Sequence, residues 1–240
     1  MDKYKKAKSL IDKSKYIIIL TGAGMSTESG VKDFRSSDGL SHTTYEGYYP
    51  ETILSRTFFY DKPQMFYDYL KEYLNVEGIL PNKGHKILAE LEGEKNITIV
   101  TQNIDALHQK AGSTNVIELH GNMERGSCTR CSKVKSLSQI FKEGPSCECG
   151  GLYKTDVVLY EENVPDIGEA FVRADKADLL IVLGTSLQVY PAASIPAAFG
   201  AGMKPAIVIN RDKTTLSGVE NVLEFNRGIG ETLEKIMSAD

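Results

Sequence analysis

Residues 97–121 have the sequence ITIVTQNIDALHQKAGSTNVIELHG, and this stretch predicts the fold. Its two short apolar runs, 97–100 and 116–119, are typical of buried parallel strands. Each run leads directly into polar side chains, which are Gln102, Asn103 and Asp105 after the first and His120 after the second. Ligands of parallel sheets bind beyond the carboxyl ends of the strands. We therefore expect an amide pair, a carboxylate and an imidazole to share one site.

Apolar runs of the same kind recur along the chain, at residues 17–20, 179–183 and 206–209. Helical patterns separate several of them, and a helix is expected first because Tyr4, Ala7 and Leu10 recur at helical spacing. Strands that alternate with helices favour the α/β class. We predict a Rossmann-like, mostly parallel sheet with helices on both faces, within one domain that spans residues 1–240.

Two segments interrupt this alternation and predict a smaller lobe. Residues 33–80 are aromatic and helical, with one apolar stripe that runs from Met65 to Leu74. Residues 123–154 contain all four cysteines and few large apolar side chains, so this segment needs a disulfide or a structural metal to fold. The expected large lobe comprises about 1–32, 81–122 and 155–240.

The composition describes an ordinary globular protein of 240 residues, with 41% hydrophobic and 25% charged residues. The net charge of −4 gives no basic footprint for nucleic acid. Lysines 3, 5, 6 and 8 form a local basic patch, which we interpret as a solvated helix face. The apolar runs are shorter than a membrane span or a signal-peptide core. We expect a cytoplasmic protein.

The four cysteines predict a zinc site. Cys128 and Cys131 form a Cys-x-x-Cys pair, and after 15 residues Cys147 and Cys149 form a Cys-x-Cys pair. Two thiolate pairs suit a closed tetrahedral zinc ion, and clustered cysteines in a reducing compartment favour metal over disulfides. Because four protein ligands leave no open position, we expect the zinc to be structural.

A glycine loop follows the first expected strand and contains Gly22 and Gly24. The loop can bring a backbone close to a ligand, and the start of a helix after it would favour a pyrophosphate. However, the dinucleotide fingerprint needs a third glycine where Thr27 stands. From these residues alone, a tight structural turn and a dinucleotide loop are both open.

Four motifs, GAGMSTESGVKDFR, TQNIDALHQKAG, ELHG and GTSLQVYPAA, occur in the order found in the sirtuins. The chain resembles this family of NAD-dependent protein lysine deacylases over residues 22–210. The resemblance implies that the acetyl-lysine oxygen attacks the nicotinamide ribose of NAD and that nicotinamide leaves. His120 then acts as general base on a ribose hydroxyl, and the acetyl group passes to ADP-ribose.

The resemblance also implies a role for each matching residue. The residues expected to be catalytic are His120, Asn103 and Asp105. Those expected to bind NAD are Gly22, Ala23, Gly24, Ser26, Thr27, Asp33, Phe34, Arg35, Gln102, Asn103, Ile104, Asp105, His120, Gly184, Thr185, Ser186, Asn210, Arg211 and Asp212. Those expected to line the peptide channel are Val157, Val158, Tyr160, Glu161, Val189 and Tyr190. His108 is expected to orient its segment, and His85 to be a surface or structural residue with Asn82 as a helix cap just before it.

The chain departs from the family pattern at Cys147 and Cys149, where the family has Cys-x-x-Cys, and at one further place, and it departs from one subgroup of the family at another. Where the family has Phe-Gly-Glu, this sequence has Tyr160, Glu161 and Glu162, which puts the local backbone geometry in question. Succinyl-preferring relatives carry Tyr-x-x-Arg after Asp-Gly-Leu, whereas Tyr45 is followed here by Glu-Gly-Tyr. Without that arginine as an anchor for a carboxylate, we predict a neutral acyl group, with acetyl first.

These features predict an NAD-dependent protein lysine deacetylase that holds NAD as co-substrate and one structural Zn²⁺. Its expected partners are acetylated lysines in proteins or peptides, with no membrane and no direct nucleic-acid binding, and we expect a monomer. The alternatives are a deacylase that prefers another neutral acyl group, a dinucleotide oxidoreductase, and a zinc-ribbon binding module. The incomplete glycine fingerprint disfavours the oxidoreductase, and the acidic net charge disfavours a nucleic-acid-binding ribbon.

Overall fold

The computed structural model describes residues 2–32 and 44–239 of the chain. Its main sheet has six strands, all parallel, in the order β3-β2-β1-β7-β8-β9. The strands are β1 (Tyr16–Thr21), β2 (Asn96–Thr101), β3 (Val116–Glu118), β7 (Leu179–Leu183), β8 (Ala206–Ile209) and β9 (Val222–Phe225). This confirms the predicted α/β class with a parallel sheet.

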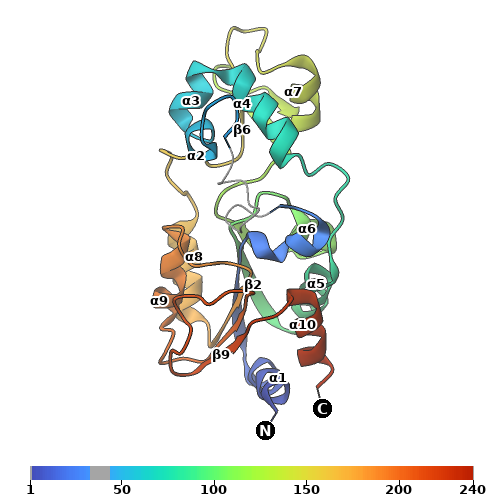
Figure 1. Cartoon of the computed structure of the whole chain (residues 1–240), viewed down its shortest axis with the longest axis vertical. Helices are drawn as coiled ribbons and strands as arrows, with labels where there is room; N and C mark the ends of the chain where they lie inside the picture. Colours follow the sequence, from blue (N-terminus) through green and yellow to red (C-terminus); the bar gives the residue numbers. More distant parts are fainter. Residues whose placement is uncertain (1, 33–43, 240) are drawn as a thin grey trace.

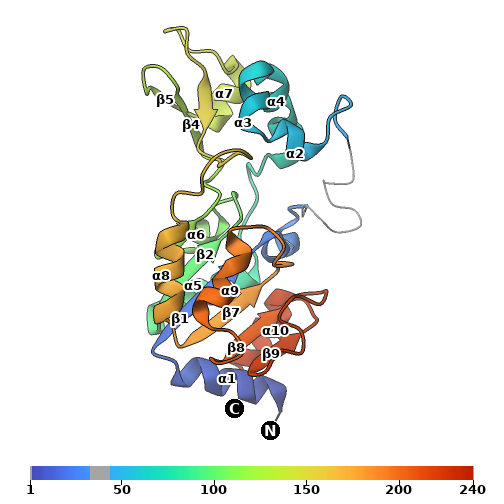
Figure 2. The same cartoon turned by 90° about the vertical axis from the view of Figure 1, so that its left-hand side faces the viewer.

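Helices cover both faces of this sheet (Figure 2). One face carries α1 (Lys3–Lys13), α5 (Lys83–Glu94) and α10 (Ile229–Met237), and the other carries α8 (Ile167–Lys176) and α9 (Ile195–Phe199). Side chains alternate along each strand, so Ile17 and Ile19 join the first core, while Ile18 and Leu20 join the second. Burial on both faces explains why the strands are continuous apolar runs.

A second group of elements lies at the other end of the molecule (Figure 1). It contains the helices α2 (Pro50–Ile53), α3 (Arg56–Asp61) and α4 (Pro63–Tyr69), a π-helical turn η4 (Leu70–Leu74), and α7 (Leu137–Glu143). An antiparallel sheet completes it, with the strands β4 (Arg125–Cys128), β5 (Val134–Ser136) and β6 (Tyr153–Thr155). Phe59 and Phe66 share one buried cluster with Ile140 and Tyr153, so the helical and cysteine segments form a common core.

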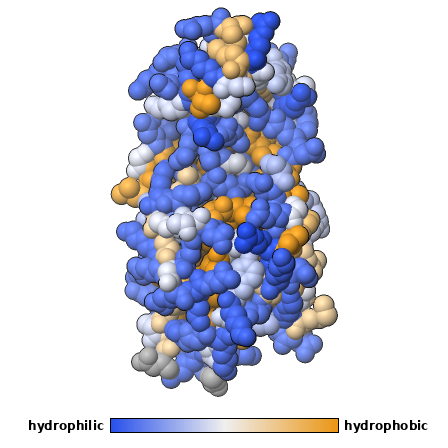
Figure 3. All heavy atoms as spheres, turned by 180° about the vertical axis from the view of Figure 1, so that it is seen from behind, coloured by the Kyte–Doolittle hydropathy of each residue, from blue (hydrophilic) through white to orange (hydrophobic). Residues whose placement is uncertain are grey.

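The surface in Figure 3 is dominated by hydrophilic residues, and the hydrophobic residues that it shows are scattered among them. Of the helices in the described part of the chain, none has both the length and the apolar content that a membrane span requires.

Two details differ from the sequence prediction. The loop after β1 forms two short 3₁₀ turns, η1 (Ala23–Met25) and η2 (Thr27–Ser29), where the start of a helix is expected from the sequence. This second turn ends at Gly30, whose φ of 88° is incompatible with continuing a helix. In addition, β9 was missed, because Val222–Phe225 is short and contains the charged Glu224.

The strand order fixes where a ligand can bind. The sheet grows from β1 through β2 to β3 in one direction, and from β7 through β8 to β9 in the other. The connection therefore changes direction between β1 and β7, and a crevice forms at the carboxyl ends of strands at such a switch point. Thr21 ends β1 and Leu183 ends β7, so the loops that follow these two residues form the base of the candidate site.

Candidate functional site

The loops after β1 and β7 are fastened to each other by backbone hydrogen bonds. Gly22 N donates to Leu183 O at 3.0 Å, and Gly24 N donates to Gly184 O at 2.8 Å. A Cβ on Gly24 would lie 2.7 Å from Gly184 Cα, and one on Gly22 would lie 2.7 Å from Thr185 Cβ. The glycines are therefore needed for contact between two chain segments, in addition to any contact with a cofactor.

A polar network joins this loop to the segment that follows β2. The buried hydroxyl of Ser26 donates to Asp105 Oδ2 at 2.6 Å, and Asn103 Nδ2 donates to Ser26 Oγ at 3.0 Å. The other carboxylate oxygen of Asp105 accepts from the backbone N–H of Leu107 at 2.9 Å, at the start of α6 (Leu107–Ala111). Asp105 thus orients the loop and the helix, while Asn103 remains half-buried beside them.

Gln102 connects the ends of three neighbouring strands. Its backbone N–H donates to Thr21 O at 3.0 Å, and its side-chain amide donates to Thr185 Oγ1 at 3.1 Å. Sequence reasoning missed Thr21 and Thr185 as partners of this amide, because a threonine at a strand end carries no distinctive signal. The structure thereby brings the residues after β1, β2 and β7 together.

His120 completes the cluster from the end of β3. Its Nδ1 lies 2.9 Å from the carbonyl oxygen of Gln102. Since a carbonyl oxygen only accepts, Nδ1 carries the proton, and Nε2 is left with a lone pair. Burial lowers the pKa of His120, and the hydrogen bond to Gln102 offsets part of that effect. A neutral imidazole with a free Nε2 lone pair is the form that a general base requires.

Gly121 allows a second segment to cross directly behind His120. Gly121 has a φ of 68°, and a Cβ there would lie 2.0 Å from Asp156 O. Beside this contact, Val158 N donates a hydrogen bond to His120 O at 2.9 Å. The segment 157–161, predicted as one side of the peptide channel, is thereby fixed to the backbone of the candidate base.

Two buried histidines lie behind the cluster. His108 Nε2 is 3.1 Å from Thr21 Oγ1, and the rings of His108 and His85 have their centroids 4.8 Å apart. Desolvation by burial lowers the pKa of His85 to about 4 and that of His108 to about 3. The predicted cap is confirmed, since Asn82 Oδ1 accepts from His85 N at 3.3 Å. Both histidines are neutral supports for the strand ends.

The residues expected to hold the adenosine end lie after β7 and β8. Gly184 N donates to Ile209 O at 3.0 Å, so the two loops are adjacent. Asn210 turns its side chain onto its own loop, where Nδ2 donates to Asp212 O at 2.9 Å, and Arg211 and Asp212 are exposed. Ser186 is half-buried in the loop after β7.

Other expected residues lie at the edge of this cluster or beyond the described chain. Thr27 Oγ1 donates to Gly24 O at 3.0 Å, and Ala23 is half-buried in the same loop. Ile104 packs against the core of the second group of elements. Asp33, Phe34 and Arg35 lie outside the described residues.

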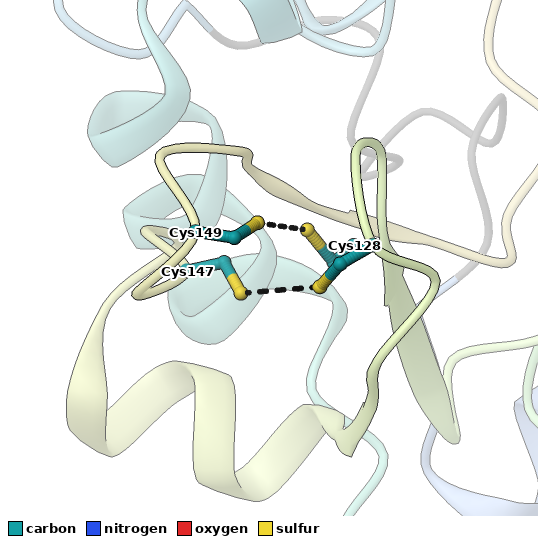
Figure 4. Close-up of side chains that lie close together, drawn as sticks. Cys128, Cys147 and Cys149 are labelled. Atoms are coloured by element: carbon teal, nitrogen blue, oxygen red, sulfur yellow. Dashed lines mark hydrogen bonds between the residues drawn. The ribbon is translucent and has the colours of Figure 1, made fainter.

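The four cysteines form a separate cluster between β4 and the turn after α7 (Figure 4). Their sulfurs all lie within 4.8 Å of one another, with Cys128 and Cys149 3.5 Å apart and Cys131 and Cys147 3.8 Å apart. In a tetrahedral site with Zn–S bonds of about 2.3 Å, sulfurs are separated by about 3.8 Å. The donor set and the spacing therefore fit one zinc ion.

The turn at the Cys-x-Cys pair shows how two ligands can be supplied by so short a spacing. Cys147 N donates to Gly151 O at 2.8 Å, and Gly150 N donates to Cys147 O at 2.9 Å. Gly150 adopts a φ of 81°, and a Cβ at Gly151 would lie 2.7 Å from Cys128 Sγ. These two glycines let the chain reverse close to the sulfurs.

Comparison with known proteins places this site in a family. The model of the Sir2 family matches residues 22–191. The NAD-dependent protein deacetylase of Fusobacterium nucleatum is 45% identical over 213 residues, which cover 87% of this chain and 81% of that relative. That of Cutibacterium acnes is 42% identical over 235 residues, which cover 95% of each chain.

Solved structures give the same result. A structure described as Sir2 with a p53 peptide and NAD⁺ has a TM-score of 0.87 and 34% identity, over 99% of this chain and 98% of that one. A Sir2 variant with deacetylated p53 peptide and 3'-O-acetyl ADP ribose has a TM-score of 0.89 and 35% identity, over 98% of both chains. Sir2Tm bound to a propionylated peptide has a TM-score of 0.86 and 34% identity, also over 98% of both.

Proposed function

This chain belongs to the Sir2 family, and from this premise we propose how its residues carry out the reaction. It is an NAD-dependent protein lysine deacetylase, which transfers the acetyl group of acetyl-lysine to ADP-ribose and releases nicotinamide. NAD is its co-substrate, and the four clustered cysteines are its zinc site.

The observation that carries the assignment of roles is the hydrogen bond between His120 Nδ1 and Gln102 O. It orients a neutral imidazole at the carboxyl edge of the sheet, just after the end of β3, which is paired with β2. When bound, NAD supplies an electrophilic ribose carbon that accepts the acetyl-lysine oxygen and loses nicotinamide. His120 Nε2 then takes the proton of a ribose hydroxyl, the step that needs a base.

We assign the nicotinamide end of NAD to Asn103 and Asp105. Ser26 hydrogen-bonds to both, so these side chains are held before the co-substrate arrives. Such preorganisation reduces the entropy that must be lost when reactants meet. The remaining cofactor residues predicted from the sequence follow the same arrangement: the loop 22–27, Gln102 and Ile104 near the ribose, and the loops 184–186 and 210–212 for adenosine. The roles of Asp33, Phe34 and Arg35 stay predictions.

The peptide is assigned to the space between the segments 157–161 and 189–190. Val157 and Leu159 bury their side chains in the core of the second group of elements, which fixes the backbone between them. Tyr160 and Tyr190 are 45% and 76% exposed, so each offers an aromatic face to a peptide. An extended peptide that pairs with such a segment gains backbone hydrogen bonds that do not depend on its sequence.

We infer the acyl preference from the sequence after Tyr45, which lacks the arginine that succinyl-preferring relatives carry. A neutral acyl group, acetyl first, is our proposal, and the propionylated peptide bound by Sir2Tm is an example in a relative. Lys62 donates to Tyr48 Oη at 2.5 Å, which brings a cation to the turn that follows Tyr45. A succinylated peptide therefore belongs in the same assay.

Incubation with NAD and an acetylated peptide tests the proposal. We expect stoichiometric release of nicotinamide, O-acetyl-ADP-ribose and deacetylated peptide, and no reduced nicotinamide. Appearance of reduced nicotinamide would favour the oxidoreductase alternative. Tight binding of the peptide without any product would favour the binding module. A higher kcat/KM for the succinylated peptide than for the acetylated one would overturn the acyl proposal.

Three further expectations stay predictions: a monomer, a cytoplasmic location, and no direct binding of nucleic acid. The net charge of −4 supports the last of these. We also retain the proposed division into a large lobe of about 1–32, 81–122 and 155–240 and a small lobe of 33–80 and 123–154.

A further inference from the structure

Glu161 adopts a backbone conformation that favours glycine. Its φ is 74°, in the left-handed region, where a residue with a Cβ is strained. Strain of this kind persists only where the surrounding structure holds it, and it concentrates at ligand clamps and active sites. Glu161 stands where the family has glycine, so its backbone conformation depends on contacts that hold it there.

The side chain of Glu161 supplies such a contact. Its Oε2 accepts from Thr57 N at 2.9 Å and from Thr57 Oγ1 at 2.7 Å. Thr57 is the second residue of α3, where backbone N–H groups lack partners within the helix. Both hydrogen bonds lower the pKa of Glu161, so the carboxylate is ionised and a strong acceptor. We call this pair of bonds the Thr57–Glu161 clamp.

Backbone hydrogen bonds run beside the clamp. Tyr160 N donates to Leu54 O at 3.0 Å, and Arg56 N donates to Tyr160 O at 3.0 Å. Two residues earlier, Val158 N donates to His120 O. The segment 158–161 therefore connects the backbone of the candidate base to the start of α3. The clamp is the contact with α3 at the carboxyl end of this segment.

We propose that Glu161 is a positioning residue for the acyl-lysine peptide, acting through the Thr57–Glu161 clamp. This inference rests on the proposed function and deepens it. The clamp holds the channel segment in its left-handed geometry before the peptide arrives, so less conformational freedom is lost on binding. The peptide KM therefore depends on the clamp, whereas the KM for NAD does not, because the NAD-binding contacts lie on other loops.

Four variants separate the clamp from the strain. Glu161→Ala removes the clamp and keeps a strained Cβ, and Glu161→Gly removes both. Glu161→Gln keeps an uncharged acceptor, and Thr57→Val keeps only the backbone N–H donor. We expect the peptide KM to rise about tenfold in Glu161→Ala and about threefold in the other three variants. The double variant Thr57→Val with Glu161→Ala should equal Glu161→Ala alone, because both changes remove the same contact.

Asn221→Ala is the matched control. Asn221 also has a positive φ, of 60°, and its side chain also makes a hydrogen bond, in which Nδ2 donates to Gly202 O at 2.9 Å. It lies next to the amino end of β9. Its loss should lower thermal stability and leave the peptide KM unchanged. Thermal unfolding of each variant checks that the fold is retained.

Three results would overturn the proposal: a peptide KM in Glu161→Ala within twofold of wild type, an equal rise in the KM for NAD, or additive effects in the double variant. Absence of nicotinamide release by the wild-type enzyme would instead refute the proposed function. The two failures are thus distinguishable. If Glu161→Ala does not fold, the comparison of Glu161→Gln, Thr57→Val and their double variant decides the question.

Discussion

The imidazole of His120 and the backbone carbonyl of Gln102 lie 2.9 Å apart, in loops that follow neighbouring parallel strands. This contact sets the tautomer of the histidine, because the proton must be on Nδ1. It also ties the orientation of the candidate base to the loop that contains Asn103 and Asp105. The chemistry of His120 is therefore fixed by a backbone atom and does not need a carboxylate partner.

Substitution His120→Ala should reduce deacetylation by about 10² to 10⁴-fold, the usual contribution of a general base. NAD binding, measured by calorimetry, and zinc content should be retained, because the substitution leaves Ser26 and the cysteines in place. A variant that keeps more than a tenth of wild-type kcat would remove His120 from the role of base.

Substitution Gly24→Ala should destabilise the fold and weaken NAD binding, because the new Cβ would lie 2.7 Å from Gly184 Cα in a rigid backbone. Gly93→Ala is the control. Gly93 lies in α5 with no atom within 4 Å of its would-be Cβ, so alanine should stabilise the helix by up to about 1 kcal/mol. The two melting temperatures should move in opposite directions. Equal shifts would contradict the close contact between the loops.

Removal of zinc should disorder the segment around β4 to β6 before the main sheet unfolds. Cys128 and Cys147 are buried in the core shared with α3 and α4, so loss of the metal exposes apolar surface there. We expect one zinc per chain by metal analysis, and loss of activity with increased binding of a hydrophobic dye on chelation. Cys149→Ser should reproduce this. Full activity of the metal-free protein would refute a structural role for the ion.

Stability should fall as the pH decreases below about 6.5. The folded chain keeps His85 and His108 neutral, with pKa values of about 4 and about 3, whereas the unfolded chain protonates them near 6.5. The unfolded state therefore binds more protons between these limits, which lowers the free energy of unfolding by on the order of 2 kcal/mol at pH 5 for each histidine.

The variant His108→Gln tests this assignment of the pH dependence. Glutamine keeps an amide near Thr21 and removes one titrating group, so the loss of stability between pH 7.5 and 5 should be smaller than in the wild type. Denaturant unfolding at both pH values measures the difference. An unchanged loss of stability would show that other groups are responsible.

Much of the fold could be predicted because short sequence patterns determine where its strands lie. Continuous apolar runs such as Leu179–Leu183 predict strands that are buried on both faces. The cysteine spacing predicted a zinc site, and the positions of the four sulfurs fit one. The short strand β9 was missed, and the start of a helix was expected where the loop after β1 forms two 3₁₀ turns. A four-residue strand and a 3₁₀ turn have no periodicity to detect.

The candidate site could be predicted only as a set of residues. The motifs selected Ser26, Asn103, Asp105 and His120, but nothing in the sequence indicated that Thr185 would bind Gln102 or that Thr57 would bind Glu161. These partners are 83 and 104 residues apart along the chain, so their contacts depend on how the elements pack.

The sequence by itself determined the α/β class, the strand ends at which polar groups gather, and the metal-binding cysteines. These depend on the order of apolar and polar residues over short distances. Only the tertiary structure decided the tautomer of His120, the loop contact that requires Gly24, and the hydrogen bonds between the Glu161 carboxylate and Thr57. Each of these contacts joins different segments of the chain, either at the carboxyl edge of the sheet or in the second group of elements. The packing of the elements sets the hydrogen-bond geometry there.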